Sequence, residues 1–287
     1  MSLDSVKGRG YRLSQALELL GQEPITAHLS VVARQRLQSL QIYQSLDSTN
    51  KLAGEQVSQK QLTQESASGT VILSEYQTAG RGRRGKQWVS PFASNIYLSI
   101  IWDFDRGAAA LQGLSLSIGV AVRRALIELD VESVQLKWPN DIYVENKKLG
   151  GILLEMVGDP AGYCSVVVGI GINVAMPAAS GHSIDQAWTD LNSVSSSSIS
   201  RNQLAALIID HSFEILADYQ DRGFAPYRDE WQESDAFRGR AGTVATAKQS
   251  ISGILCGVDD NGALQIQLEN GETQSFIGGE LSLRLSK

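Results

Sequence analysis

The stretch GRGRRGKQW, at positions 80–88, combines four cationic side chains with three glycines. The chain as a whole carries a net charge of −6, so these cations form a local cluster and not part of a generally basic surface. Glycine loses much conformational entropy on folding and is kept where the backbone must approach a partner closely or take an unusual φ. This loop therefore predicts the binding of a small anionic ligand. Its cations are Arg81, Arg83, Arg84 and Lys86.

Three other interpretations of the loop are less well supported. Gly80, Gly82 and Gly85 fit the dinucleotide fingerprint G-x-G-x-x-G, but that motif needs a helix directly after its last glycine, and the sequence KQWVSPF has no helical periodicity. RNA-binding Arg-Gly segments form long tracts or grooves with several stacking aromatic residues, whereas Trp88 is the one aromatic residue near these arginines. A solvated charge run would not need interleaved glycines.

Two further segments carry groups that an anionic ligand needs. KWPND at 137–141 ends an expected strand with a lysine, an amide and a carboxylate. KLGG at 148–151 places Lys148 beside bare backbone at the start of another strand. Each segment alone is a weak signal, and together they favour a ligand site.

Composition limits the class of protein. The hydrophobic fraction of 43% and the charged fraction of 20% are typical of a globular protein. Cys164 and Cys256 are too few and too far apart for a disulfide framework or a zinc site, which predicts a reduced, cytoplasmic setting. The sequence shows no signal-peptide core and no continuous run of about 18 apolar residues, so we expect no membrane association.

The expected elements mix strands and helices without regular β-α-β alternation, which favours an α+β fold. Helices are expected within 14–40, with Pro24 as an interruption, early in 51–68, and at 108–129 and 201–221. Glu145-Asn146-Lys147 is an expected hairpin turn, and the Ser-rich stretch 177–200 is an expected loop. Strands are expected at 41–46, 71–77, 95–102, 134–138, 141–146, 151–157 and 163–173.

The last fifty or so residues have a different pattern. Short β-like runs alternate with Asn261-Gly262 and Asn270-Gly271, which are dipeptides typical of hairpin turns. This pattern predicts a small β-barrel domain at the C-terminal end of the chain.

In this order, GRGRRGKQW, KWPNDIY, KKLGGIL and GIGINV resemble segments of the bacterial biotin–protein ligases, which share a catalytic domain class with the lipoate ligases. DSTN at 47–50 and FIGGELSLR at 276–284 extend the resemblance from residue 41 towards the C-terminus. The resemblance implies a mixed-sheet catalytic domain that binds biotin and ATP at 41–237 and an SH3-like β-barrel at 238–287. Residues 1–40 are then the remnant of a wing from a winged helix-turn-helix, followed by a helical linker.

The resemblance implies a two-step ligation that uses biotin, ATP and Mg²⁺. The biotin carboxylate attacks the α-phosphate of ATP, which gives biotinyl-AMP and pyrophosphate. A lysine of a biotin carboxyl carrier domain then attacks the acyl carbonyl and releases AMP. The first step brings two anions together, so preorganised cations are its main requirement. The matching positions of the family assign this role to Lys148 and Arg83, and Asp141 is added as a catalytic residue that orients a lysine or touches Mg²⁺.

The remaining site residues follow from the same resemblance, and no metal ligand is assigned. The residues expected to bind biotin are Ser48, Thr49, Asn50, Gln77, Arg81, Gly82, Arg83, Lys148 and Gly151. The residues expected to bind ATP are Arg83, Trp88, Lys137, Asn140, Lys148 and Asn173.

Two alternatives stay open from the sequence. A lipoate or octanoyl ligase or transferase shares the domain class, although RGRRG together with KWPND is the biotin-type combination. A non-enzymatic repressor would use biotinyl-AMP only as a corepressor. The expected acceptor is the biotin carboxyl carrier of acetyl-CoA carboxylase. The strand at 151–157 either lies inside the sheet or forms an edge that pairs with its twin in a homodimer.

We predict that this chain does not bind an operator sequence specifically. SVKGRGYRL at 5–13 resembles the end of a wing, and the few residues before it cannot form the helix that reads the major groove. Lys7, Arg9 and Arg12 would make only weak phosphate contacts. An electrophoretic shift assay on a biotin-operon operator, with biotin and ATP at about 0.15 M salt, tests this against a scrambled duplex. A complex in the nanomolar range that forms only with the operator would contradict the prediction.

Overall fold

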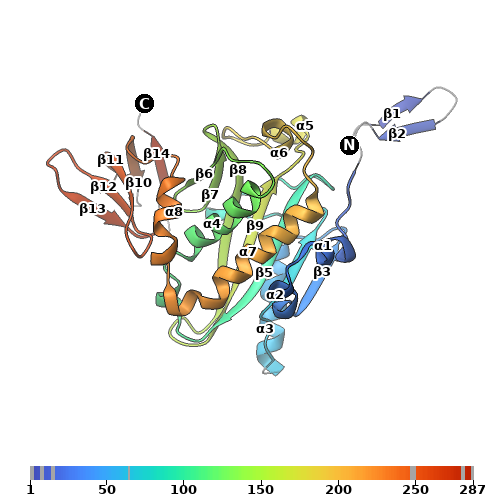
Figure 1. Cartoon of the computed structure of the whole chain (residues 1–287), viewed down its shortest axis with the longest axis horizontal. Coiled ribbons are helices and arrows are strands. Elements are labelled where there is room, and N and C mark those ends of the chain that lie inside the picture. Colours follow the sequence, from blue (N-terminus) through green and yellow to red (C-terminus); the bar gives the residue numbers. More distant parts are fainter. Residues whose placement is uncertain are drawn as a thin grey trace.

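A seven-stranded mixed sheet forms the centre of the molecule in the computed structural model (Figure 1). The structure describes residues 3–6, 10–13, 17–63, 65–245, 250–278 and 282–285. The pair β3–β4 is parallel, and the other neighbouring strands are antiparallel. In spatial order the strands are β3 (Ser39–Tyr43), β4 (Thr70–Ser74), β5 (Asn95–Phe104), β9 (Cys164–Asn173), β8 (Lys147–Gly158), β7 (Asp141–Val144) and β6 (Val134–Lys137).

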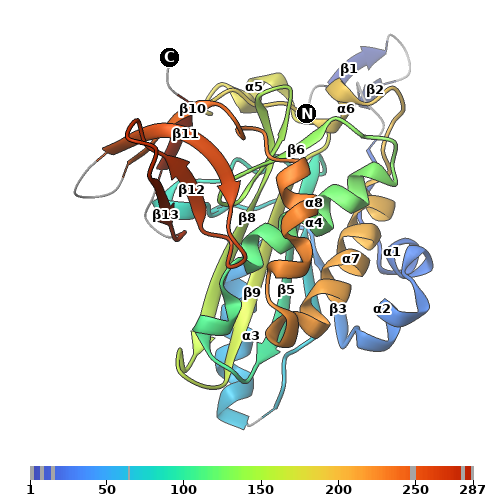
Figure 2. The ribbon, with the colours of Figure 1, turned by 60° about the vertical axis from the view of Figure 1, so that its left-hand side comes forward.

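Helices cover both faces of this sheet (Figures 1 and 2). Side chains alternate between the faces along a strand. On β4, Val71 and Leu73 belong to the main core, whereas Ile72 packs with Ala53 and Val57 of α3 in a second, smaller core. Helix α3 therefore covers the face opposite to α4 and α7. The helices are α1 (Gln22–His28), α2 (Val31–Arg36), α3 (Thr49–Thr63), α4 (Leu114–Ile127), α5 (Ala178–Gly181), α6 (Leu191–Val194), α7 (Arg201–Arg222) and α8 (Arg228–Glu233).

The prediction that Pro24 interrupts a helix is wrong. Pro24 is the third residue of α1. The first N–H groups of a helix have no intrahelical acceptor, so a proline in the first turn removes no hydrogen bond. The helix expected at 108–129 begins only at Leu114, after a 3₁₀ turn at Ala108–Leu111. The stretch 177–200 is mostly loop, as predicted, and holds the two short helices α5 and α6.

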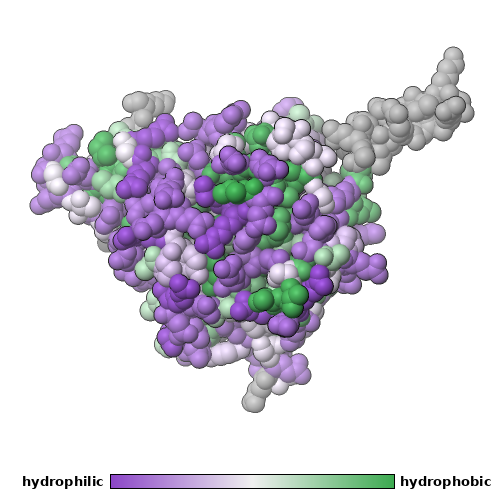
Figure 3. All heavy atoms as spheres, in the orientation of Figure 1, coloured by the Kyte–Doolittle hydropathy of each residue, from purple (hydrophilic) through white to green (hydrophobic). Residues whose placement is uncertain are grey.

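The segment Ala108–Ile127 has the length and mean hydropathy of a membrane-spanning helix, which the sequence interpretation did not anticipate. It is not a continuous apolar run, because it contains Gln112, Arg123 and Arg124. Most residues of α4 are buried, between α7 and the sheet. Its apolar composition is explained by this packing, and the surface on the side of α4 and α7 is largely hydrophilic (Figure 3).

A five-stranded antiparallel sheet follows α8, where the small β-barrel domain was predicted (Figure 2). The expected turns are present, since Gly262 and Gly271 have φ of 77° and 85°. The turn between β7 and β8 is also confirmed, with positive φ at Glu145 and Asn146. In spatial order the strands are β13 (Thr273–Phe276), β12 (Leu264–Gln267), β11 (Ser250–Val258), β10 (Ala241–Ala245) and β14 (Ser282–Leu285).

The N-terminal strands β1 (Leu3–Val6) and β2 (Gly10–Leu13) pair as an antiparallel hairpin. Parts of two predicted motifs lie outside the described residues. These are Lys7, Gly8 and Arg9 of the expected wing and Gly279, Glu280 and Leu281 of FIGGELSLR.

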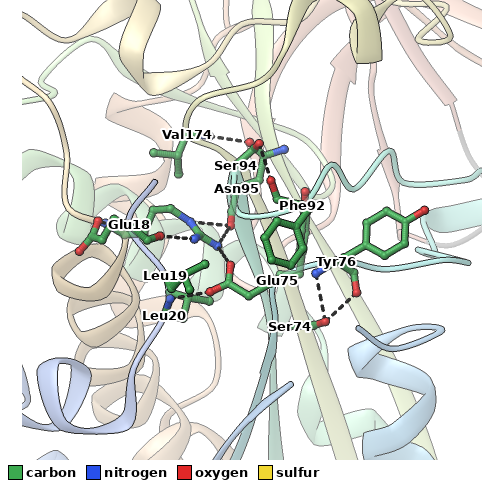
Figure 4. Close-up of polar contacts among 12 residues, drawn as sticks. Glu18, Leu19, Leu20, Ser74, Glu75, Tyr76, Phe92, Ser94, Asn95 and Val174 are labelled. Atoms are coloured by element: carbon green, nitrogen blue, oxygen red, sulfur yellow. Dashed lines mark hydrogen bonds and ion pairs between the residues drawn. The ribbon is translucent and has the colours of Figure 1, made fainter. Parts of the chain in front are cut away.

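A buried ion pair fastens the segment before α1 to the sheet (Figure 4). Arg201, the first residue of α7, lies 2.8 Å from Glu75, and each residue is only 3% exposed. Arg201 also donates to the backbone oxygens of Asn95 and Glu18, while the Leu20 N–H donates to Glu75. A buried pair is stable only when hydrogen bonds satisfy its remaining atoms. Glu18 and Leu20 supply two of those bonds, so the segment before α1 packs as part of the structure around the central sheet.

We predict that Asp235 makes the protein less stable as the pH rises from about 4 to about 6. Asp235 follows α8 beside β6, and burial raises the pKa of its carboxyl group to about 6. A raised pKa means that the folded state binds the proton more tightly than the unfolded state. The contribution of protonated Asp235 to stability is complete below the pKa that its carboxyl group has in the unfolded state. It is lost as the pH rises through the pKa of the folded state. Asp235→Asn should remove this pH dependence, which amounts to at most about 3 kcal/mol in the free energy of unfolding.

Urea unfolding of both proteins at pH 4 and pH 7 measures this difference. The variant should gain stability relative to the parent chain at pH 7. An identical difference at both pH values would show that Asp235 titrates normally.

Candidate active site

The candidate active site is a cavity of about 570 Å³ on the sheet face that α3 covers only in part. Val167 on β9 packs against α3, and Gly169 and Gly171 point to the same face further along that strand. Tyr97 on β5 and Gly151 on β8 lie beside Gly171 on either side. Because glycine has no side chain, the middle of this face is open. The cavity occupies the opening.

Two glycines are required by close contacts. A Cβ atom on Gly169 would lie 2.2 Å from Oδ1 of Asn50. A Cβ atom on Gly171 would lie 2.6 Å from the indole of Trp88. The first turn of α3 and the end of the 80–88 loop therefore rest directly on β9. The sequence interpretation used GIGINV only as part of the resemblance and did not assign these glycines to the site.

A β-bulge aims Lys148 into the cavity. On β7, Ile142 and Tyr143 are neighbours, but their partners on β8 are Gly150 and Lys148, so Leu149 is the extra residue. A bulge shifts the alternation of side chains by one residue. Lys148 consequently faces the same side as Gly151, and Leu149 is fully buried in the main core.

One carboxylate lies between two lysines on the floor of the cavity. Oδ1 of Asp141 is 2.5 Å from Nζ of Lys148, and Oδ2 is 3.6 Å from Nζ of Lys137. These three side chains are at most 16% exposed. Lys137 also lies 4.9 Å from the centre of the Tyr143 ring, and burial raises the pKa of Tyr143 to about 12. Two charges against one leave this part of the site with a net positive charge.

The 80–88 loop folds over the cavity in a compact turn. Arg83–Gly85 forms a 3₁₀ turn in which Arg84 and Gly85 have φ of 58° and 71°. Backbone hydrogen bonds close its base, from Gly82 to Lys86 and from Trp88 to Gly80. Arg83 Nη1 donates to Oδ1 of Asn140 at 3.1 Å. Burial lowers the pKa of the Arg83 guanidinium, and the negative charge of Asp141 opposes that shift.

The polar turn at the start of α3 is tied to Gln77. The backbone N–H of Thr49 donates to Oε1 of Gln77 at 2.9 Å, so Gln77 satisfies a free amide in the first turn of the helix. Nε2 of Gln77 donates to the Ser90 hydroxyl. Ser48, Thr49 and Gln77 are all more than 90% buried. Their polar atoms form a neutral wall at the end of the cavity away from Lys137.

The structure brings together all the predicted site residues except one. Asn173 does not line the main cavity, and its amide donates to the backbone oxygen of Thr189. Asn173 lines a smaller cavity of about 260 Å³ beside Trp88 and Lys148. The buried Nε1 of Trp88 has no hydrogen-bond partner within the described part of the chain. This N–H lies directly over Gly171 on β9.

Several lining residues were missed by the sequence interpretation. Tyr97 and Ile152 lie inside strands that were predicted only as strands. Asp185 and Gln186 come from the Ser-rich loop. Arg284 reaches the cavity from β14 in the C-terminal sheet. Strand alternation around GIGIN was a usable signal for the first pair. Arg284 lies in FIGGELSLR, which extended the resemblance but was not assigned to the site.

Comparison with known proteins agrees with this arrangement. The family model "Biotin/lipoate A/B protein ligase family" matches residues 42–173, and "Biotin protein ligase C terminal domain" matches residues 239–284. The bifunctional ligase/repressor BirA of Escherichia coli is 36% identical over 98% of this chain and 83% of that protein. The biotin–[acetyl-CoA-carboxylase] ligase of Paracoccus denitrificans is 32% identical over 72% of this chain and 90% of that protein.

The fold is also similar to a solved structure of a ligase with its substrates. The biotin protein ligase from Aquifex aeolicus in complex with biotin and ATP has a TM-score of 0.73 and 27% sequence identity, and the match covers 87% of this chain and 100% of that one. The mixed sheet with its C-terminal antiparallel sheet is thus the fold of a ligase that binds biotin and ATP. The chain belongs to the biotin protein ligase family.

We predict that Gly169→Ala weakens biotin binding at least tenfold while the protein stays folded. The new methyl group would collide with Asn50, whose side chain is buried and held by hydrogen bonds, so the first turn of α3 must move. Gly54→Ala on α3 is the control, because nothing lies within 4 Å of the added methyl group. Isothermal titration with biotin measures both. Unchanged affinity in Gly169→Ala would exclude this contact from the binding site.

Proposed function

We propose that this chain activates biotin with ATP and then joins it to a lysine of a biotin carboxyl carrier domain. The observation that supports this most directly is the position of Lys148. Its ammonium group is buried in the cavity, is held by Asp141, and lies between the neutral wall at Gln77 and the cationic floor at Lys137. A ligand that binds at this wall through its uncharged end would place its carboxylate beside Lys148.

Biotin is assigned to the part of the cavity between the neutral wall and Lys148. The ureido ring is polar and uncharged, so it needs matched donors and acceptors, and Ser48, Thr49 and Gln77 provide them in a buried setting. Asn50 is committed to β8 and β5, which makes it a support for this wall. Arg81, Gly82 and Gly151 line the path from the wall towards Lys148.

ATP is assigned to the cationic floor and the smaller cavity. Arg83 and Lys137 are placed to neutralise phosphate oxygens, with Asn140 holding Arg83 in position. Trp88 lines both cavities and offers its ring to the nucleotide. Asn173 serves the nucleotide by holding the loop at Thr189.

In the first step, the biotin carboxylate attacks the α-phosphate, and pyrophosphate leaves. Lys148 and Arg83 offset the repulsion between the two anions and the negative charge that develops on the phosphate oxygens. Such preorganised charge is usually the largest catalytic contribution. Asp141 fixes the direction of the Lys148 ammonium group through their ion pair, so it acts as a positioning group.

Mg²⁺ is proposed to enter with the phosphates of ATP. Among the described residues, no group of three metal-binding side chains is present, and the buried Asp141 is already occupied by two lysines. Mg²⁺ keeps several water ligands and is commonly bound through substrate phosphates. The residues present fit a metal that is bound mainly by the nucleotide.

In the second step, the neutral amine of the acceptor lysine attacks the acyl carbonyl and forms the amide bond. The bond between the acyl carbon and the phosphate oxygen breaks, AMP leaves with its electron pair, and the amine nitrogen loses a proton to solvent. The acetyl-CoA carboxylase named in the Paracoccus relative suggests that its biotin carrier is the acceptor. A lipoyl acceptor is the second candidate, since the family model includes lipoate ligases. A thermal-shift comparison of biotin with lipoate distinguishes them.

A homodimer is proposed through β8, in a cytoplasmic setting. The strand lies inside the sheet between β7 and β9, but β7 pairs only with residues 147–151. Ile152 is hydrogen-bonded to Asn140 through both its N–H and its C=O. Beyond Ile152, no described strand pairs with the edge of β8 that faces away from β9. A twin chain could extend the sheet there. Operator binding is not part of this proposal.

We predict that Lys148→Ala slows biotin-dependent pyrophosphate release by about 10²–10³-fold. Lys147→Ala is the matched control, because Lys147 is exposed and is not among the residues that line the cavity. Incubation of each protein with biotin, MgATP and a carrier domain, read by mass spectrometry, reports the complete reaction. Near-normal release from folded Lys148→Ala would remove this lysine from the catalytic role, and an unmodified carrier with the parent chain would refute the proposed function.

A further inference from the structure

A chain of hydrogen bonds joins the two ends of the 80–88 loop by way of the cavity wall. It begins at Arg81, whose Nη2 lies 2.6 Å from Oε2 of Glu155 on β8. The same carboxylate oxygen accepts a hydrogen bond of 2.8 Å from Nδ2 of Asn50. Glu155 thus connects the beginning of the loop to the first turn of α3.

The connection continues through buried groups to the end of the loop. The Ser99 hydroxyl contacts both Oδ1 of Asn50 and the Thr49 hydroxyl, at 2.6 and 2.8 Å. Thr49 donates to Gln77, and Gln77 donates to the Ser90 hydroxyl. That hydroxyl donates to the backbone oxygen of Trp88 at 3.0 Å. In order, the members are Arg81, Glu155, Asn50, Ser99, Thr49, Gln77, Ser90 and Trp88.

The pair Arg81–Glu155 is the most exposed connection in this chain. The side chains of Arg81 and Glu155 are 44% and 34% exposed, whereas the residues from Asn50 to Ser90 are all more than 90% buried. Lys86 offers the loop one other ion pair, with Asp185, at 4.0 Å and with both side chains largely exposed. Exposed pairs at that distance contribute little. Arg83 ties the middle of the loop to Asn140. The Arg81–Glu155 pair ties the beginning of the loop to β8, so this pair must separate when that part of the loop opens.

We infer that Glu155 is a positioning residue that holds the loop closed over the acyl adenylate. Glu155 is not assigned a contact with the reacting atoms, because its hydrogen bonds are made to Arg81 and Asn50. This inference rests on the proposed function, because the adenylate is the species that the closed loop retains. An acyl adenylate that escapes is lost to water, which attacks its carbonyl and gives free biotin and AMP. Closure protects it until the acceptor lysine arrives.

The test measures how much adenylate escapes. Glu155→Gln keeps an oxygen that can accept from Asn50 but removes the charge opposite Arg81. The variant and the parent chain are supplied with biotin, MgATP and a limiting amount of carrier domain. Free biotinyl-AMP and its hydrolysis products are compared with biotinylated carrier. We expect the escaping fraction to rise about two- to fivefold, the range for a partly exposed ion pair. Adenylation itself should change little.

Two controls separate this role from a general structural one. Glu55→Gln makes the same chemical change in an exposed carboxylate of α3 that lines the groove beside Glu155, and its escaping fraction should equal that of the parent chain. In an Arg81→Met background, Glu155→Gln should add no further escape, since the pair is already broken. A support role through Asn50 alone would still increase escape in that background and would overturn the inference.

Further outcomes are equally decisive. Equal escape from Glu155→Gln and the parent chain would refute the inference while leaving the proposed function intact. Absence of biotin-dependent pyrophosphate release from the parent chain would refute the proposed function itself. Sedimentation velocity at the assay concentration shows whether Glu155→Gln changes self-association through the β8 edge. If the variant shows both a changed mass and increased escape, the escape is assigned to association, and the inference about loop closure is overturned.

Discussion

The active-site cavity depends on three glycines that leave one face of the central strands bare. Gly151, Gly169 and Gly171 lie beside one another on β8 and β9. Asn50 fills the space above Gly169, and Trp88 fills the space above Gly171. The same positions that make room for ligands thus fix the two segments that enclose them. A larger residue at Gly169 or Gly171 would both reduce the cavity and displace the segment that rests on that glycine.

Electrostatics then decides what the cavity can hold. Asp141 lies close enough to two lysines to keep both in place, yet one carboxylate cannot neutralise them. Placing cations out of solvent is costly unless a carboxylate and hydrogen bonds compensate. The remaining positive charge is the part that an incoming phosphate or carboxylate would balance. The neutral wall at Thr49 and Gln77 carries no such charge, so the two ends of the cavity favour different parts of a ligand.

The segment before α1 and the candidate active site are held by the same buried network of hydrogen bonds. Glu75 pairs with Arg201, and two residues later Gln77 forms the neutral wall. Arg201 also holds the backbone of Asn95, whose side chain accepts a hydrogen bond from the backbone of Val174, before the loop that borders the smaller cavity (Figure 4). The buried network therefore connects the segment before α1 to the surroundings of both cavities through direct contacts.

The sequence by itself determined the chemistry of the site and the local turns. The cations of GRGRRG, the lysines around KWPND and the turn at Glu145-Asn146 could be recognised because charge, bare backbone and positive φ are properties of neighbouring residues. Only the tertiary structure decided where these groups point. The bulge at Leu149 turns Lys148 into the cavity, and Arg284 arrives from another sheet. Both depend on pairing between distant strands, which side-chain periodicity along one segment cannot specify.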